Sequence, residues 1–396
     1  MKFKLQEIVD VTMGQSPKSE FYNTERKGYP FLQGNRTFGF KYPTFDTYTT
    51  VMTKPAKAGD VIMSVRAPVG DLNITPVDMC LGRGVCSLRM KNGNQSFLYY
   101  MMKYYVPHLL KKESGTVFGS VNRNDINGLE VDIPEDEQTQ RKIARYLEMI
   151  DEKIELNTAI NNNLEQQAQA IFKEWFIDNP ENENWSNGTF SELIQSTLSG
   201  DWGKEAPTGN NTEKVYCVRG ADIPEVKAGN KGKMPTRYIL PKNYASKKLI
   251  TGDIVVEISG GSPTQSTGRC TAISESLLNR YDSGMVCTNF CRAIKPISGY
   301  SMFIYYYWQY LYDKGVFFSY ENGTTGIKNL DINGFLGTEP IIIPPEEKVL
   351  AFDDYCQTVF DQIFANGKES EQLAQLRDAL LPKLMSGELD VSDINF

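Results

Sequence analysis

The chain has 396 residues, of which 40% are hydrophobic and 23% are charged, and its formal net charge at pH 7 is −7. This length is sufficient for two or three domains that each have a core of their own. No apolar run approaches the roughly 20 residues that a membrane-spanning helix needs, and the opening MKFKLQEIVD lacks the apolar core of a signal peptide. The sequence therefore predicts a cytoplasmic protein without membrane association.

The cysteine and histidine content gives no indication of a metal site. Seven scattered cysteines are typical of reduced thiols in a cytosolic protein. Cys287 and Cys291 in CTNFC, like Cys80 and Cys86, are spaced too widely for a zinc knuckle, and His108 is the only histidine. We therefore expect no bound metal.

The charge is distributed unevenly along the chain. Residues 1–134 carry +5 (17 Lys and Arg against 12 Asp and Glu), and residues 186–345 carry +2 (16 against 14). Residues 135–185 carry −7 (5 against 12), and residues 346–396 also carry −7 (4 against 11). Because binding to a nucleic-acid backbone needs Lys and Arg, the two basic segments are the ones expected to face a polyanion. An ordinary Glu-rich helix surface explains the acidic segments equally well.

Residues 1–134 predict a mixed domain of short strands and turns with one helix. The runs GDVIMSVRAP (59–68) and GRGVCSLRM (82–90) predict strands that begin at glycine turns. SFLYYMMKYYVPHLLKK (96–112) predicts a helix that its internal proline kinks or ends. After a polar loop, LEVDIP (129–134) predicts a final strand.

Residues 135–178 predict one long helix with a coiled-coil seam. Acidic residues fill its first turn, as the helix dipole favours. Mostly apolar residues then recur at alternating steps of four and three, which is the coiled-coil spacing. The seam consists of Ile143, Leu147, Ile150, Ile154, Asn157, Asn161, Leu164, Ala168, Ile171 and Trp175.

The order of features repeats after a polar linker, DNPENENWSNGT (178–189). FLQGNRTF (31–38) is echoed by CVRGADI (217–223), and the aromatic helix is echoed by SMFIYYYWQYLYDKG (301–315). Residues 257–270, which are rich in glycine, predict a surface loop. A second seam, displaced by 209 positions, consists of Phe352, Cys356, Val359, Ile363, Asn366, Ser370, Leu373, Arg377, Leu380 and Leu384.

The predicted fold is therefore α+β, with a globular domain and a long helix each present twice. The domains are 1–134 and 179–345, and the helices that separate them are 135–178 and 346–396. Two equivalent units related by an internal twofold place their helices antiparallel, as a coiled-coil pair.

The antiparallel arrangement predicts which seam residues meet. In a symmetric pair Asn161 lies near Asn366, and Asn157 lies near Ser370. Polar seam residues of this kind fix the register of a coiled coil. The alternative is a loosened, solvated segment in the middle of each helix.

Sequence signatures of catalysis are missing from the chain. It has no phosphate-binding Gly-x-x-x-x-Gly-Lys-[Ser/Thr], no dinucleotide fingerprint and no nucleophile elbow. A single histidine also makes a Ser or Cys triad improbable. The sequence thus predicts a non-catalytic chain with no cofactor of its own.

Four segments carry a resemblance to a known family. IPEDEQTQRKIARYLEMIDEKIELN (133–157) and LRDALLPKLMSGEL (376–389) resemble the central and C-terminal conserved regions of type I restriction-modification specificity subunits. LQEIVDVTMGQSP (5–17) and FSELIQSTLSGDWG (190–203) resemble the start of that family's target recognition domains. The resemblance spans the whole chain in the right order. One departure is Pro382, after which the C-terminal helix is expected to end with an irregular last turn.

The resemblance implies a subunit that gives a larger enzyme its DNA address and does no chemistry itself. Each target recognition domain would read one half of a bipartite double-stranded DNA target, and the paired helices would set the spacer between the halves. The implied partners are two methyltransferase subunits, which bind S-adenosylmethionine and methylate adenine, and optionally a translocating restriction subunit. A different class stays open, namely a coiled-coil adaptor that joins two proteins without touching DNA.

Polar loops between the predicted strands supply candidate DNA contacts. Arg and Lys suit guanine edges and phosphates, whereas Asn, Gln, Ser and Thr suit adenine and the backbone. The candidates are Gln33, Asn35, Arg36, Lys111, Lys112, Thr116, Arg123, Arg219, Lys231, Lys233, Arg237, Arg269 and Lys328. Ordinary solvated surface fits each of them equally well. Tyr99, Tyr100, Tyr104, Tyr305 and Trp308 invite a base-stacking interpretation, but their helical spacing favours core packing.

Overall fold

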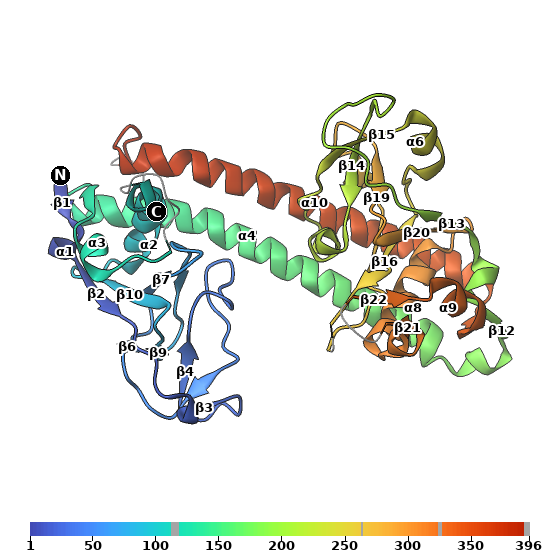
Figure 1. The fold of residues 1–396 in the computed structure, drawn as a ribbon, viewed down its shortest axis with the longest axis horizontal. Helices are drawn as coiled ribbons and strands as arrows, with labels where there is room; N and C mark the ends of the chain where they lie inside the picture. Colours follow the sequence, from blue (N-terminus) through green and yellow to red (C-terminus); the bar gives the residue numbers. More distant parts are fainter. Residues whose placement is uncertain (112–118, 263, 324–326, 392–396) are drawn as a thin grey trace. The chain divides into compact units, whose positions relative to one another are not determined.

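The computed structural model describes residues 1–111, 119–262, 264–323 and 327–391 (Figure 1). It forms two compact units, of which unit 1 comprises Met1–Glu152 with Leu373–Phe396 and unit 2 comprises Lys153–Gln372. Each long helix therefore contributes residues to both units. Within the described ranges, no helix is both long and apolar enough to cross a membrane.

Unit 1 is built on an antiparallel four-stranded sheet covered by an aromatic helix. The strands, in spatial order, are β2 (Val9–Met13), β10 (Val85–Met90), β7 (Val61–Ser64) and β8 (Leu72–Ile74). The covering helix is α2 (Gln95–Lys111). Pro107 lies inside α2 without ending it. Tyr99 and Tyr100 are fully buried, which confirms core packing for this helix.

Shorter elements complete unit 1. A second set of strands has the spatial order β3 (Tyr22–Asn23), β5 (Tyr48–Thr49), β4 (Tyr29–Leu32), β9 (Met79–Leu81), β6 (Pro55–Ala56). Within it β4 and β9 run parallel. The other elements are β1 (Lys2–Lys4), which pairs with β11 (Glu130–Asp132), and the short helices α1 (Leu5–Ile8), η1 (Ser19–Phe21) and α3 (Arg123–Asn127).

Unit 2 repeats this topology. Its four-stranded sheet has the order β13 (Ile194–Ser199), β20 (Cys291–Pro296), β16 (Ile254–Glu257), β18 (Cys270–Ala272), and its aromatic helix is α8 (Ser301–Asp313). β14 (Glu213–Val218) pairs in parallel with β19 (Met285–Cys287), as β4 does with β9, and β15 (Thr236–Ile239) flanks β14. β12 (Ser186–Thr189) pairs with β23 (Pro340–Ile343), as β1 does with β11. The matching strand order confirms the tandem duplication.

The remaining elements of unit 2 are short. The strands are β17 (Ser259–Gly260), β21 (Glu321–Asn322) and β22 (Lys328–Leu330). The helices are η3 (Pro180–Asn184), η4 (Phe190–Leu193), η5 (Gly220–Asp222), α5 (Ile223–Lys227), α6 (Pro241–Lys247), α7 (Glu275–Leu278), η6 (Val316–Tyr320) and α9 (Ile332–Thr338). The predicted linker 178–189 thus contains helix η3 and strand β12.

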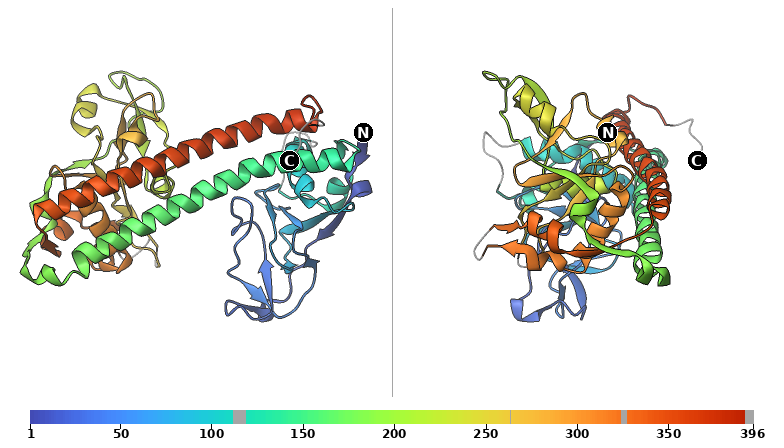
Figure 2. Two further views of the ribbon diagram at one scale, coloured as in Figure 1. Left: turned by 180° about the vertical axis from the view of Figure 1, so that it is seen from behind. Right: turned by 90° about the vertical axis from the view of Figure 1, so that its right-hand side faces the viewer.

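The two long helices are α4 (Glu137–Phe172), which continues as a π-helical turn η2 (Lys173–Ile177), and α10 (Glu346–Met385). Within each unit they lie side by side (Figure 2). In unit 2 they run antiparallel, because Asn157 contacts Ser370 while Asn161 contacts the earlier residue Asn366. In the structure α10 stays helical past Pro382 to Met385.

The seam of each helix faces its partner. Ile143, Leu147, Ile150 and Ile154 are buried on α4, and Phe352, Cys356, Val359 and Ile363 are buried on α10. The polar residues in the middle of the seam are buried as well, since Asn157, Asn161 and Asn366 are 1%, 5% and 8% exposed. The middle of the helix pair is therefore packed and not solvated.

The prediction of a surface loop at 257–270 is wrong at the two ends of the segment, whereas Gly261, Thr264 and Gln265 are exposed. Glu257, Ser266 and Thr267 are buried. The indole Nε1 of Trp308 donates to the carbonyl of Gly268 at 2.7 Å, which ties the segment to α8. Gly268 has φ +99°, a backbone conformation that few residues with a side chain tolerate. Its glycine is therefore explained by the backbone conformation of a buried segment.

Candidate nucleic-acid interface

Both predicted pairs on the helix seam are in contact. Asn366 Nδ2 donates to Asn161 Oδ1 at 2.8 Å, and Asn157 Nδ2 donates to Ser370 Oγ at 3.2 Å. Asn161 Nδ2 also donates to the backbone carbonyl of Ile363 at 3.0 Å. These directional bonds, made in a buried setting, favour one register of the two helices over its neighbours.

The parallel strand pairs end in equivalent turns in the two units. After β9, the amide of Gly82 donates to the carbonyl of Leu32 at 2.8 Å. After β19, the amide of Thr288 donates to the carbonyl of Val218 at 2.9 Å. These two hydrogen bonds are equivalent in the two units, so residue 82 corresponds to residue 288. We call residues 82–84 the first strand-end turn and residues 288–290 the second strand-end turn.

A glycine loop closes against each strand-end turn. A Cβ on Gly14 would lie 2.0 Å from the carbonyl oxygen of Gly82, and a Cβ on Gly200 would lie 1.9 Å from that of Thr288. Neither position has room for a side chain, because the obstacle is backbone. The conserved geometry explains why both GQSP and GDWG begin with glycine.

Each strand-end turn borders a hollow. The first hollow has a volume of about 560 Å³ and is lined by residues from 17–22, 31–37 and 46–47, together with Arg83. The second hollow has a volume of about 450 Å³ and is lined by Trp202, 219–221, Glu257, Ser259 and 288–290. Volumes of a few hundred Å³ are of the size that accommodates a small planar group. The chain therefore offers one concave, polar-edged surface per domain at the same structural position.

Three predicted contacts of unit 1 lie at or near the first hollow. Gln33 Oε1 accepts from Ser16 Oγ at 2.8 Å, and Asn35 donates to Asp71 at 2.5 Å. Arg36 donates to both oxygens of Asp46, at 2.9 and 2.7 Å. This pairing lowers the pKa of the Asp46 carboxyl.

The other candidates of unit 1 lie elsewhere. Lys111 is exposed at the end of α2. Arg123 Nη2 donates to the carbonyl of Val11 at 2.6 Å and thereby fastens α3 to β2. Lys112 and Thr116 lie outside the described residues.

In unit 2 three predicted cations are held by carboxylates of their own domain. Arg219, on the rim of the second hollow, donates to both oxygens of Asp222 at 2.9 and 3.0 Å, and this raises the pKa of its guanidinium. Arg269 pairs with Glu257 through two bonds of 2.8 Å. Lys328 pairs with Glu321 at 2.7 Å. These bonds preorganise the cations but offset their charge.

The last three predicted cations of unit 2 lie near aromatic rings or at the open surface. Lys231 lies 4.6 Å from the centroid of the Tyr281 ring. Arg237 stacks at 3.8 Å on the ring of Trp202 and pairs with Glu205 at 3.1 Å. Lys233 is exposed.

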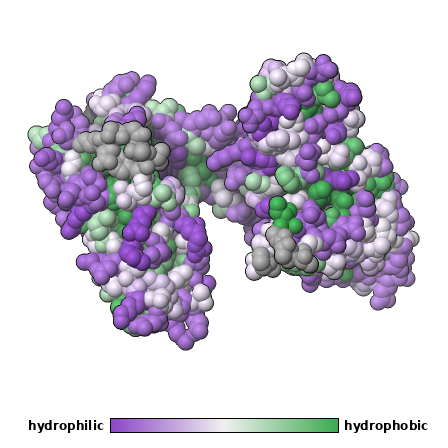
Figure 3. Space-filling model, viewed as in Figure 1, coloured by the Kyte–Doolittle hydropathy of each residue, from purple (hydrophilic) through white to green (hydrophobic). Residues whose placement is uncertain are grey.

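The strand-end turns are not among the contacts that the sequence predicts. Arg83 is exposed, and its guanidinium has no hydrogen-bond or ion-pair partner among the described residues. Asn289 is exposed on the second turn, and Phe290 is 60% exposed. Apolar side chains at the surface of unit 2 are visible in Figure 3. LGRG (81–84) and CTNF (287–290) occupy equivalent places in the two units, but they share no residue type. Only the pairing of the strands reveals that they correspond.

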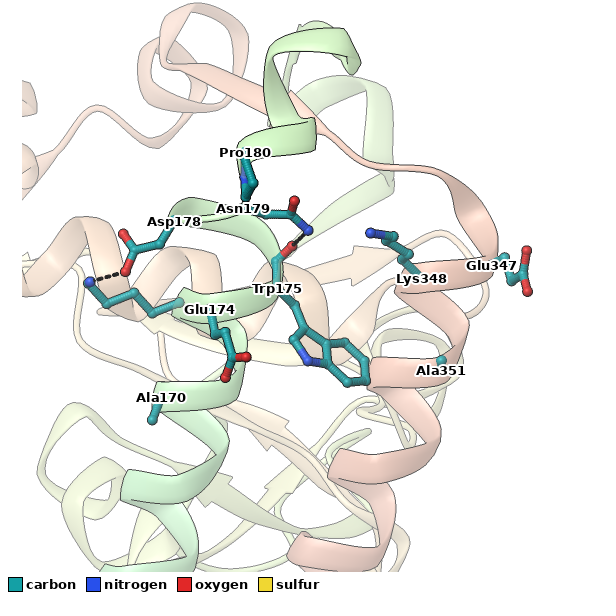
Figure 4. Close-up of a pocket in the computed structure, with 10 residues that line it drawn as sticks. Ala170, Glu174, Trp175, Asp178, Asn179, Pro180, Glu347, Lys348 and Ala351 are labelled. Atoms are coloured by element: carbon teal, nitrogen blue, oxygen red, sulfur yellow. Dashed lines mark hydrogen bonds and ion pairs between the residues drawn. The ribbon is translucent and has the colours of Figure 1, made fainter.

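A third hollow, of about 830 Å³, lies in unit 2 where α4 ends and α10 begins (Figure 4). Trp175 lines it, and the carbonyl of Trp175 accepts from Asn179 Nδ2 at 3.0 Å. Lys173 and Asp178, which form an ion pair, also line this hollow. Lys348, in the first turn of α10, lines it as well. It is a surface hollow on the helix pair, with no cluster of catalytic groups at its lining.

The cysteines are free and buried, and burial raises the pKa of Cys86, Cys217 and Cys270 to about 12. Such thiols are protonated at neutral pH and unsuited to nucleophilic attack. Among the residues that the structure describes, no three His, Cys, Asp or Glu side chains converge as metal ligands would.

Comparison with known proteins bears directly on these two domains. Residues 1–166 match the model of the type I restriction modification DNA specificity domain. The chain is 24% identical over 420 residues to the type I restriction enzyme MjaIX specificity subunit of Methanocaldococcus jannaschii, covering 99% of this chain and 94% of that one. Residues 1–166 thus match the specificity domain of this family, and the chain is similar to a type I specificity subunit over nearly its full length.

Two further similarities point to the same family. The putative type I restriction enzyme MjaX specificity subunit of the same archaeon is 36% identical over 163 residues, which cover 41% of this chain and only 38% of that relative. The crystal structure of the type I restriction-modification system S subunit from M. genitalium has a TM-score of 0.55 at 16% identity, covering 99% of this chain and 96% of that one. That structural similarity supports the α+β fold of this chain over nearly its whole length.

Proposed function

We propose that this chain is the DNA-specificity subunit of a type I restriction-modification complex. Each of its two globular domains reads one half of a bipartite double-stranded target, and the helix pair sets the spacer between the halves. The observation that carries the proposal is the duplicated domain, which presents an equivalent strand-end hollow twice. The match of residues 1–166 to the specificity-domain model and the full-length similarity to a specificity subunit support the same conclusion.

The chain supplies recognition, and the chemistry belongs to its partners. The specificity family is non-catalytic in general. We infer that two methyltransferase subunits, which carry S-adenosylmethionine, dock on the acidic helix pair and methylate adenine at sites that this chain selects. The third hollow, beside Trp175, is an exposed surface on that pair within unit 2. A restriction subunit is the further partner that would convert recognition into cleavage.

Mapping of adenine methylation tests the proposal. The chain is coexpressed with its methyltransferase partner in a host that lacks adenine methylation, and the genome is sequenced for methylated adenines. We expect one bipartite motif that disappears when this chain is omitted. A methyltransferase that keeps the same motif without this chain would contradict the proposal.

Gel shifts separate the proposal from the adaptor hypothesis. The specificity subunit is expected to retard random-sequence duplex DNA, and more strongly together with methyltransferase subunits, with binding that weakens as salt rises because phosphate contacts release counterions. A protein adaptor is expected to leave the duplex unshifted under every condition.

A further inference from the structure

The two strand-end turns occupy the same place in their domains but carry different chemistry. The first turn reads Gly82, Arg83, Gly84, and the second reads Thr288, Asn289, Phe290. Differences at equivalent positions of a duplicated scaffold are where two different half-sites would be told apart. In the first turn only position 83 has room for a side chain, because a Cβ on Gly82 or Gly84 would lie 2.6 or 2.4 Å from a backbone oxygen.

Both turns hold their side chains on fixed backbone. In the first turn the amide of Gly84 donates to the carbonyl of Gln33 at 2.9 Å, and the amide of Arg83 donates to Ser16 Oγ at 3.1 Å. In the second turn the amide of Cys291 donates to the carbonyl of Thr288 at 2.9 Å, and the amide of Ile258 to that of Phe290 at 2.9 Å. A side chain on a fixed turn loses little backbone entropy on binding, which suits base readout.

Each strand-end turn carries one polar side chain that has no partner among the described residues. In the first hollow the guanidinium of Arg36 is already paired with Asp46, whereas that of Arg83 has no partner among the described residues. In the second hollow Arg219 is paired with Asp222, whereas the Asn289 amide makes no hydrogen bond within the described part of the chain. Each hollow thus keeps a polar turn side chain available to a ligand, beside other groups without a partner in the described residues, such as Gln33 Nε2 and Ser259 Oγ.

We propose that the strand-end turns are the base-reading elements, with the first reading a G·C pair through Arg83 and the second reading an A·T pair through Asn289 and Phe290. The inference rests on the proposed function. Arg forms two hydrogen bonds to guanine O6 and N7, Asn forms two to adenine N6 and N7, and a phenyl ring contacts the methyl group of thymine. The amide and the phenyl ring, on consecutive exposed residues of the second turn, supply the two kinds of contact that one A·T pair offers in the major groove.

The test compares methylation motifs in the host described above. Arg83→Ala is expected to relax a G·C position in one half of the motif, and Asn289→Ala and Phe290→Ala to relax an A·T position in the other half. Loss of one bidentate contact reduces discrimination between matched and mismatched sites by roughly 10- to 100-fold. Arg83→Lys keeps the positive charge but loses the paired N–H donors of the guanidinium. We expect it to relax the same G·C position less than Arg83→Ala does.

Matched controls guard against unspecific effects. Arg141→Ala removes an exposed arginine on α4, and Phe318→Ala removes an aromatic side chain of unit 2 that is 44% exposed and does not line the second hollow. Both are expected to keep the parental motif. Thermal unfolding of each variant shows that it is folded, and a misfolded alanine variant is replaced by Arg83→Gln or Phe290→Leu, with the same expected relaxation.

The possible outcomes separate a failure of the base-reading inference from a failure of the proposed DNA-specificity function. An unchanged motif in folded Arg83 and Asn289 variants overturns the inference and leaves the DNA-specificity function intact. A uniform fall in methylation at every site, with no position relaxed, assigns the turns to phosphate contact and also overturns it. Methylation by the parental complex without any motif overturns the function itself.

Discussion

At the scale of single residues, Asn161 on the helix seam combines burial with hydrogen bonds at both of its side-chain polar atoms. Asn161 is 5% exposed and bonds to Asn366, to the carbonyl of Ile363 and, at 3.1 Å, to the carbonyl of Ala228. A buried amide of this kind stabilises only while its partners are present, because an unpaired buried donor or acceptor carries its full desolvation cost. The same residue thus joins α4, α10 and the loop after α5.

Replacement of Asn161 measures this pairing. Asn161→Ala leaves Asn366 Nδ2 and two carbonyls without their partner, so we expect a loss of about 1–3 kcal/mol of unfolding free energy. Asn162→Ala, at the exposed neighbouring position, is expected to stay within about 0.5 kcal/mol of the parent. Urea unfolding compares the two. Equal effects of both substitutions would contradict a packed polar seam.

Lys103 gives a prediction for the dependence of stability on pH. Burial, and next the neighbouring Arg377, lowers its pKa from 10.5 to about 8. Between these pH values the unfolded chain still holds the proton that the folded chain has released, so the contribution of Lys103 to stability grows as the pH rises from about 8 and is lost as it falls through that value.

Lys103→Met removes this titration. We expect the variant to be more stable than the parent at pH 7 and to gain less stability than the parent between pH 8 and 9.5. Urea unfolding at several pH values provides the comparison, and using the difference between variant and parent cancels the other titrating groups. Parallel curves for the two proteins would show that Lys103 titrates normally.

At the scale of elements, the last third of α10 is fastened to unit 1 by a buried ion pair. Arg377 Nη1 lies 2.7 Å from Asp151 Oδ1, and Asp151 is fully buried. Tyr100 from α2 donates to the other oxygen of Asp151 at 2.7 Å. One carboxylate on α4 therefore links α2, α4 and α10.

Breaking this pair from the cation side is expected to be costly. Arg377→Ala leaves the Asp151 carboxylate buried without a counter-charge, so we expect a loss of about 3–5 kcal/mol. Asp378→Ala removes the exposed second partner of Arg377 and is expected to cost less than about 1 kcal/mol. The two variants are compared by chemical unfolding. A small effect of Arg377→Ala would indicate that water already reaches Asp151.

The elements also show how far sequence reasoning reaches. Helix length, seam and register follow from spacing, because positions 209 apart share one pattern and symmetry supplies the rest. The aromatic helices were recognised as core from their period. The pairing of Arg377 with Asp151 was not foreseeable, since 226 positions separate them and nothing local marks Asp151 as buried. The strand-end turns were missed for the same reason, since only the parallel pairing aligns Arg83 with Asn289.

At the scale of the whole molecule, the proposed role of the helix pair as a spacer can be tested by lengthening both helices. The test inserts one heptad after Glu152 in α4 and one after Gln372 in α10. Both insertions lie at the boundaries of the two units, so they leave the contacts within each unit in place. A heptad adds about 10 Å of helix, which corresponds to roughly three base pairs of DNA. We expect the unspecified spacer of the methylated motif to lengthen accordingly while both half-sites stay the same. An unchanged spacer would rule out the helix pair as a ruler.

Unit 1 is assembled from the two ends of the chain, and this has a consequence for synthesis. On the ribosome, Asp151 emerges long before Arg377, and at 5–20 residues per second the interval is roughly 10–45 s. Throughout that time the nascent first domain carries an uncompensated carboxylate and an open apolar seam at Ile143 and Leu147. A chain stopped after Gln372 is therefore expected to be cleaved by proteases within 137–152, where the full-length chain resists. The speed of translation through the second domain thus sets how long the first domain remains without the C-terminal part of α10.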